Sequence, residues 1–184
     1  MYKWIDFNLR KIQKSDLGIV LEWRNSERIR KNMYTEHIIS LEEHQEWYSR
    51  LQKADDKISL IFEYKNQPIG LVSFTEIDNY NSTAFWGFYI GQATTLKGMG
   101  RIMGILGIEY AFQQIKICKL CGEAIAFNIG SINFHSKLGF KEEGEFGKKI
   151  FKNGQYQDII RFTLFQEEWA IIGSSIKESV FTLI

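Results

Sequence analysis

The sequence has only one proline and two cysteines in 184 residues, and it has no long apolar run. A membrane span needs about 18 consecutive apolar residues, so we expect no membrane partner. The first residues show no apolar segment typical of a signal peptide, which predicts a cytoplasmic protein with reduced cysteines. Cys118 and Cys121 stand three apart on an expected strand and so face opposite sides, and we expect no metal site there.

An excess of charge of one sign is also missing. The chain has 23 basic and 22 acidic residues, a net charge of +1, and the two signs are interspersed. Proteins that bind nucleic acids usually carry a basic patch, so we expect no nucleic-acid partner. Apolar residues make up 45% of the chain and aromatic residues 15%, which indicates a globular core and enough aromatic side chains to line a pocket.

Hydrophobic periodicity and turn signals predict a single mixed α/β domain at residues 1–168. Strands are expected at residues 7–12, 58–64, 69–77, 83–90 and 119–127, and in a hairpin over 140–165 that turns at Asn153-Gly154. Helices are expected at residues 17–23, 27–31, 101–114 and 131–138, and from the capping box at Ser40 to residue 51. The tail, 169–184, could be a docked strand or helix or a dimer contact, which leaves a homodimer possible.

The turn Leu96-Lys97-Gly98-Met99-Gly100-Arg101 lies between an expected strand and an expected helix. Glycines let backbone N–H groups approach a ligand, and a helix N-terminus presents unsatisfied N–H groups and the positive end of its dipole. These features predict a phosphate or pyrophosphate site.

Four interpretations of this turn are compared. It could be a dinucleotide site, a P-loop, a coenzyme A site or a tight turn that binds nothing. The third glycine, Gly104, stands one position too late for the dinucleotide pattern, and the P-loop pattern is absent.

Two motifs taken together resemble the GNAT superfamily of N-acetyltransferases. The turn resembles the superfamily's motif Q/R-x-x-G-x-G/A, and the segment from Asn128 to Phe140 resembles N-x-x-[AS]-x-x-x-Y-x-K-x-G-F. The resemblance covers residues 7–165. It implies the GNAT fold, a mixed sheet of about seven strands with a splayed V-shaped cleft and about four flanking helices. Thr95 departs from the usual Gln or Arg, and His135 replaces a common Tyr.

The resemblance implies that acetyl-CoA is the cofactor and that an amine attacks its thioester directly. His135 occupies the position that commonly protonates the leaving thiolate, and Glu123 is the candidate base on the strand after the long helix. The expected cofactor contacts are Phe88, Tyr89, Ile90, Lys97, Gly98, Met99, Gly100, Arg101 and Asn128.

A narrower resemblance is to the nucleotide-sugar N-acetyltransferases of pseudaminic acid biosynthesis. Those enzymes acetylate the 4-amino group of a UDP-linked dideoxy amino sugar, which implies a small-molecule nucleotide-sugar substrate and a place in bacterial surface-glycan synthesis. The shared residues are Glu22-Trp23-Arg24-Asn25, Met33, Ile38, Glu42-Glu43-His44 and Gly87-Phe88-Tyr89.

The acceptor is expected in the loop between the early helices. Met33 and Tyr34 would line its sugar, Arg24 and Arg30 would face its diphosphate, and Glu76 is a weaker candidate for the base. The segment W-R-N also resembles ribosomal-protein alanine N-acetyltransferases, so an N-terminal protein acetyltransferase is the alternative. A non-catalytic acyl-CoA-binding module is a third possibility.

Overall fold

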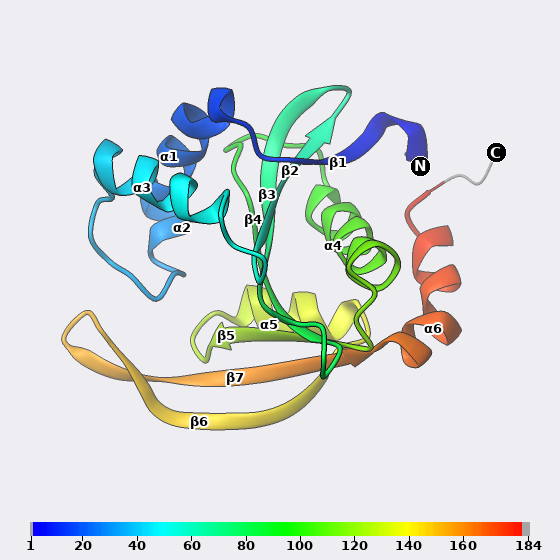
Figure 1. Cartoon of the computed structure of the whole chain (residues 1–184). Coiled ribbons are helices and arrows are strands. Elements are labelled where there is room, and N and C mark those ends of the chain that lie inside the picture. Colours follow the sequence, from blue (N-terminus) through cyan, green and yellow to red (C-terminus); the bar gives the residue numbers. More distant parts are fainter. Residues whose placement is uncertain (1, 182–184) are drawn as a thin grey trace.

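The computed structural model describes residues 2–181, which form one seven-stranded sheet with helices on both faces (Figure 1). The strand order is β1-β2-β3-β4-β5-β7-β6. Strands β4 and β5 are parallel, and all other neighbouring strands are antiparallel. The strands are β1 (Phe7–Lys11), β2 (Ile58–Tyr64), β3 (Gln67–Asp78), β4 (Thr83–Ile90), β5 (Lys119–Ile125), β6 (Lys141–Lys152) and β7 (Gln155–Phe165).

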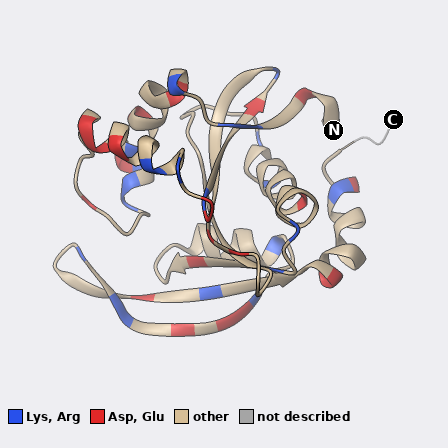
Figure 2. Ribbon diagram, in the orientation of Figure 1, with Lys and Arg blue, Asp and Glu red and all other residues tan. Residues whose placement is uncertain are grey.

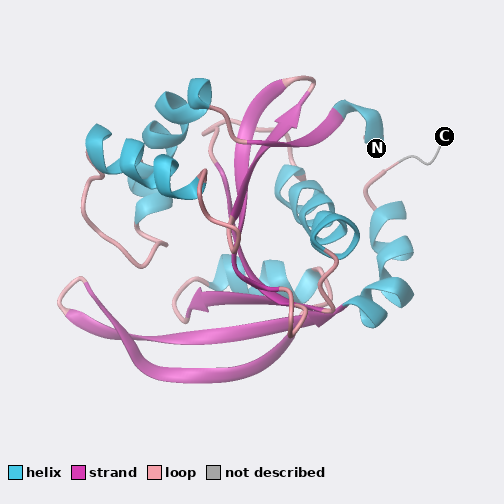
Figure 3. Cartoon of the chain, viewed as in Figure 1, coloured by secondary structure: helices cyan, strands magenta, loops and turns pink. Residues whose placement is uncertain are grey.

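Helices α1, α2 and α3 pack on one face of the antiparallel strands, and α4 packs on the other face (Figure 3). The alternation of side chains along β2 explains this arrangement, because Ile61 faces α1 whereas Leu60 and Phe62 face α4. The helices are α1 (Leu17–Asn25), α2 (Glu27–Arg30), α3 (Leu41–Leu51), α4 (Met99–Tyr110), α5 (Ile129–Lys137) and α6 (Gln166–Glu178).

The predicted mixed sheet of seven strands is confirmed, and the described residues form six α-helices where about four were expected. The predicted capping box forms at α3, where Ser40 Oγ accepts from the Glu43 N–H and the Glu43 carboxylate accepts from the Ser40 N–H. The five helices expected from the sequence pattern form as α1 to α5, and the sixth, α6, forms in the C-terminal tail.

The C-terminal tail is part of the same packed unit. Helix α6 begins before residue 168, so the expected division at that residue falls inside a helix. The buried Trp169 donates its indole N–H to Glu109 of α4 at 2.9 Å, and Lys177 makes an ion pair with the same carboxylate. Met1 and residues 182–184 lie outside the described range. Within residues 2–181, every helix is too short or too polar to span a bilayer.

The feature that positions the site is the divergence of β4 from β5. The two strands pair only between Thr83–Trp86 and Lys119–Gly122, and both continue beyond the last paired residues. Residues 87–90 and 123–125 therefore form the two walls of a V-shaped cleft in the middle of the sheet. The splayed cleft implied by the motifs is present.

Candidate active site

The glycine turn lies at the mouth of the cleft and begins α4. Gly98 is the residue before the helix and has φ +94°, a conformation that side chains disfavour. The first α-helical bond runs from the Ile102 N–H to the Gly98 carbonyl. Among the described residues the N–H groups of Gly98, Gly100 and Arg101 have no backbone acceptor, so they are available to an anion.

The close approach of α4 to α5 depends on a glycine as well. A Cβ at Gly104 would lie 2.5 Å from Leu138 Cδ1 and 2.7 Å from Phe134 Cζ. Helix α5 therefore packs directly on α4, and its N-terminal residues reach the cleft. Asn128 caps α5 by accepting the Ser131 N–H at 3.1 Å, and both residues line the cavity.

Strand β4 supplies backbone donors to the cleft. The Gly91 N–H donates to the Ile69 carbonyl at 2.8 Å, and this bond fixes the alternation of hydrogen bonding along the β3–β4 pair. Tyr89 pairs with Leu71 of β3, so Phe88 and Ile90 direct their N–H and C=O groups to the side from which β5 has diverged. Arg28 confirms this direction, because its Nη2 donates to the Ile90 carbonyl at 3.0 Å.

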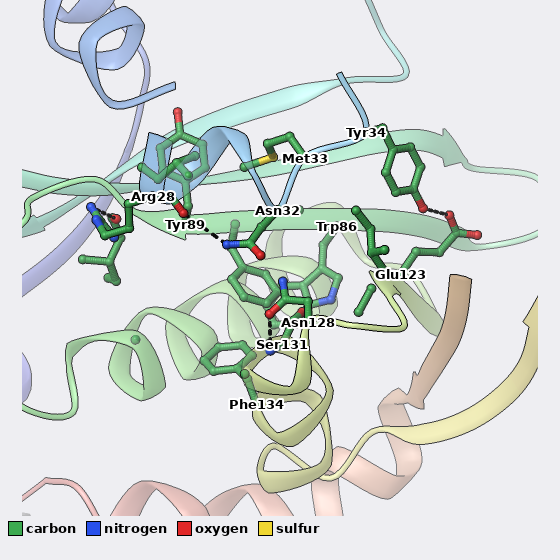
Figure 4. A pocket seen from close by; sticks show the side chains of 18 of the residues that line it. Arg28, Asn32, Met33, Tyr34, Trp86, Tyr89, Glu123, Asn128, Ser131 and Phe134 are labelled. Atoms are coloured by element: carbon green, nitrogen blue, oxygen red, sulfur yellow. Dashed lines mark hydrogen bonds between the residues drawn. The ribbon is translucent and has the colours of Figure 1, made fainter. Parts of the chain in front are cut away.

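The cleft encloses a cavity of about 570 Å³, the cleft cavity. Figure 4 shows Asn32 on one side of it and Asn128 and Ser131 on the other, with Trp86 and Phe134 beside them. Coenzyme A would fit these residues. Free N–H groups and a positive-φ glycine at the mouth suit its pyrophosphate, and the wedge between β4 and β5 suits its pantetheine arm.

Glu123 lines the cleft cavity from β5 and is held by several partners. Its Oε1 accepts from Arg161 Nη2 at 2.6 Å and from Lys149 Nζ at 3.3 Å, and its Oε2 accepts from the Tyr34 hydroxyl (Figure 4). Burial acts to raise the pKa of the Glu123 carboxyl. The bonds from Tyr34 and Arg161 and the charge of Lys149 outweigh this effect, and the net pKa lies below its usual value.

A second cavity of about 430 Å³ lies behind β4, between the sheet and helices α1 and α3. We call it the back pocket. Both cavities are lined by Arg24, Met33 and Thr35 and by the β4 residues 87–89, so these residues lie between them.

The comparisons with known proteins agree with this geometry. The family model described as Acetyltransferase (GNAT) domain matches residues 9–160 of the chain. The chain is a GNAT acetyltransferase. Spermidine N(1)-acetyltransferase of Escherichia coli K12 is 26% identical over 88% of this chain and 87% of its own length. Acetyltransferase PseH of Campylobacter jejuni is 30% identical over 60% of this chain and 67% of its own length.

Solved structures show the same fold. Spermidine N-acetyltransferase from Vibrio cholerae, in complex with CoA and spermine, superposes with a TM-score of 0.84 and 23% identity, covering 90% of this chain and 99% of that chain. Membership of the GNAT family makes the chain an acyltransferase with acetyl-CoA as its donor.

The GNAT domain places most of the predicted cofactor residues around the cleft. Phe88, Tyr89, Ile90, Gly100 and Asn128 line the cleft cavity. Lys97, Gly98 and Arg101 lie in the same turn as Gly100 but do not themselves line the cavity. The Met99 side chain is 2% exposed in the core, so only its backbone can contribute. Their contacts with acetyl-CoA stay predictions.

His135 lies in the core of the GNAT domain and not on the cavity surface. It is 1% exposed, and its ring stacks on Phe162. Nδ1 lies 2.8 Å from the Ser131 carbonyl and so carries the proton, and Nε2 accepts the Trp86 indole N–H at 3.2 Å. Burial lowers its pKa to about 4, against a smaller opposite effect of Ser131. A neutral histidine with both nitrogens bonded inside the core cannot protonate a thiolate in the cleft, which corrects the expected acid role.

Two acceptor-site expectations are also corrected. Glu76 is exposed at a bulge of β3 with φ +50°, and it lines neither cavity. Arg30 donates to the Glu36 carbonyl at 2.7 Å and lines neither cavity. Arg24, Met33 and Tyr34 line the cleft cavity, and their contacts with an acceptor stay predictions.

Sequence reasoning missed four residues that the structure brings to the two cavities. Arg28, Asn32 and Ser131 line the cleft cavity, and His44 lines the back pocket. The spacing of Arg28 four residues after Arg24 is a local signal that could have identified it. His44 was named only as part of the narrower resemblance, and its burial depends on the packing of α3 against α1.

Proposed function

We propose that the chain transfers the acetyl group of acetyl-CoA to the amino group of a nucleotide-linked amino sugar, with the sugar between the two cavities and the nucleotide in the back pocket. The observation that carries this proposal is a pair of buried polar atoms without partners. Arg24 Nη1 and His44 Nε2 are both buried without a hydrogen-bond partner within the described range, and both residues line the back pocket.

Buried polar atoms without partners are costly, because each loses its hydrogen bonds to water. His44 is 4% exposed, and burial lowers the pKa of its ring despite the opposite effect of a bond with the Leu17 backbone. A neutral His44 can therefore accept a hydrogen bond at Nε2. The positively charged guanidinium of Arg24 can donate hydrogen bonds. Hydroxyl and phosphate oxygens of a nucleotide match this donor and acceptor pair.

The charges around the cavities favour an anionic acceptor over a polyamine. Four cationic side chains line the two cavities, namely Arg24, Arg28, Arg50 and Lys57. The carboxylates that line them are Glu43, which is bonded to His37, and Glu123, which is bonded to two cations. A polyamine would need free carboxylates for its remaining ammonium groups. Figure 2 shows that α1–α3 carry both basic and acidic residues.

The backbone of β4 explains how the GNAT fold assists the reaction. Acetyl-CoA supplies the acyl group as a thioester. The N–H groups of Phe88 and Ile90 point into the cleft, where they can stabilise negative charge on the thioester oxygen. The low pKa of Glu123 makes it a weak base, so we propose that it orients Tyr34 and the incoming amine by hydrogen bonding.

A thiol-release assay tests the proposal. Acetyl-CoA is incubated with UDP-linked 4-amino-4,6-dideoxy sugars, with spermidine, and with peptides that carry a free N-terminus. Turnover with a nucleotide sugar and not with spermidine or a peptide is the expected result. Turnover only with spermidine or only with a peptide would replace the nucleotide-sugar proposal, and release of thiol on no acceptor would remove it.

A further inference from the structure

Lys152 is a charged side chain in the interior of the protein. It is the last residue of β6, directly before the Asn153-Gly154 turn, and only 1% of its surface is exposed. Its Nζ donates to the Met33 carbonyl at 2.9 Å, although 119 residues separate the two in sequence. Burial of an ammonium group costs several kcal/mol unless hydrogen bonds compensate it, so a lysine at this position calls for a structural role.

The turn beside Lys152 makes a second contact with the same loop. The Asn153 N–H donates to the Glu36 carboxylate, and Arg30 Nη1 donates to the Glu36 carbonyl. We define residues 31–36 as the acceptor loop. In Figure 1 this loop follows α2 and lies next to the tip of the β6–β7 hairpin.

The acceptor loop is thus fastened to the other half of the domain at three points. Lys152 and Asn153 hold it from the hairpin, and Glu123 holds it from β5 through Tyr34. The first of these points is the Met33 carbonyl, and Met33 lines both cavities. The position of the Met33 backbone therefore decides where the wall between the cleft cavity and the back pocket stands.

We propose that Lys152 is a positioning residue for acceptor binding. Its ammonium holds the Met33 carbonyl, fixes the Met33 side chain as the wall between the cavities, and so sets the affinity for the acceptor without touching it. The inference rests on the proposed function only in placing the acceptor beside this wall, and it does not depend on which amine is acetylated. Donor binding at the glycine turn lies at the other end of the cleft and is independent of it.

The test compares Lys152→Met with Lys141→Met, a control on the same strand. Lys141 is exposed and pairs with Glu168, far from the loop. Methionine keeps most of the volume of Lys152 and leaves no unpaired charge, so the fold should persist. Glu36→Ala breaks the neighbouring contact from the loop side without a change in the core.

Hydrogen–deuterium exchange of residues 31–36 and steady-state kinetics are the measurements. Loss of a hydrogen bond from a charged group predicts roughly ten-fold faster exchange in the loop and a roughly ten-fold higher acceptor KM in Lys152→Met. We expect unchanged kcat, unchanged KM for acetyl-CoA, and a smaller effect in the same direction for Glu36→Ala. Lys141→Met should resemble the wild type in every respect.

Two results would overturn the inference. One is an exchange rate of residues 31–36 in Lys152→Met that equals the rate in the wild type. The other is a faster exchange of these residues with an unchanged acceptor KM. The proposed function fails in a different way, by absence of wild-type turnover on nucleotide sugars, and the kinetics then use whichever amine in the panel is acetylated. The exchange measurement needs no acceptor, so it decides whether Lys152 holds the loop in either case.

Discussion

The two ends of the cleft are built in different ways. The donor end uses backbone groups that are close in sequence, the N–H groups of the glycine turn and of β4. The acceptor end uses side chains from distant segments, such as Tyr34 with Glu123 and Lys152 with Met33. A donor shared by the whole family can be bound by fold geometry alone, whereas an acceptor that differs between members is selected by side chains that can change independently. Four substitutions test this difference, from the largest expected effect on turnover to the smallest.

Gly98→Val should have the largest effect, and it should act on the donor end alone. A β-branched side chain at φ +94° costs about 2 kcal/mol, so the turn shifts and its N–H groups lose the pyrophosphate. We expect the KM for acetyl-CoA to rise roughly thirty-fold with little change in acceptor KM. Gly18→Val is the control, because a side chain there meets nothing within 4 Å. An equal rise in the KM for acetyl-CoA and in the KM for the acceptor would show that the two ends of the cleft do not bind their ligands independently.

Arg24→Met should act on the acceptor end alone. The change removes the unpartnered Nη1 and the 2.6 Å bond from Nη2 to Thr35 Oγ1. Loss of one charged hydrogen bond predicts a roughly ten-fold higher acceptor KM, with acetyl-CoA KM unchanged. Lys53→Met, at an exposed position after α3, is the matched control. An unchanged acceptor KM would remove Arg24 from the acceptor site.

Glu123→Gln separates an orienting role from a general-base role. We expect kcat to fall less than about ten-fold, since loss of a true general base costs about 10²–10⁴-fold. Because the pKa of Glu123 is lowered in the folded state, its ion pairs stabilise the fold above the usual value of 4.5 and lose this effect as pH falls through the folded pKa. The variant should therefore show a weaker loss of thermal stability in acid. A kcat that falls more than a hundred-fold would restore Glu123 as the base.

His135→Phe should change turnover least and stability most visibly. Its pKa of about 4 lies below the ordinary value of 6.5, so the unfolded chain binds a proton more readily than the folded chain between these values. Wild-type stability should thus be greatest above pH 6.5 and fall by up to about 3 kcal/mol as pH drops through 4. The variant should lose this pH dependence.

The phenylalanine also leaves the buried Trp86 N–H without its acceptor, which costs about 1–3 kcal/mol at neutral pH. Thermal unfolding from pH 4 to 8 measures both effects, and kcat should stay within two-fold of the wild type. A large fall in kcat with normal stability would support the acid role that the motif implies.

Local patterns predicted most of the fold. The strands at residues 58–64 and 83–90 have the predicted bounds, because each is a run of β-forming residues between clear turn signals. For the tail a strand, a helix and a dimer contact all stayed open, because the stability of α6 comes from contacts of Trp169 and Lys177 with Glu109, 60 and 68 residues away. Such contacts leave no periodic signal in the tail itself.

At the site, too, local motifs could be predicted from the sequence and long-range contacts could not. The glycine turn and the motif that begins at Asn128 were identified because both are local in the sequence. The burial of His135 was not foreseen, since it depends on Gly122 of a neighbouring strand, where a Cβ would lie 2.4 Å from His135 Nε2. Tyr34 contacts Glu123 from 89 residues away and Met33 contacts Lys152 from 119 residues away, so sequence spacing gives no indication of these two contacts.

The most direct test of the account is calorimetric titration of the protein with UDP and, separately, with spermidine. We expect UDP to bind the wild type through the back pocket, and we expect Arg24→Met to weaken this binding about ten-fold. Spermidine should give no heat of binding. Tight binding of spermidine together with no binding of UDP would contradict the nucleotide-sugar acceptor.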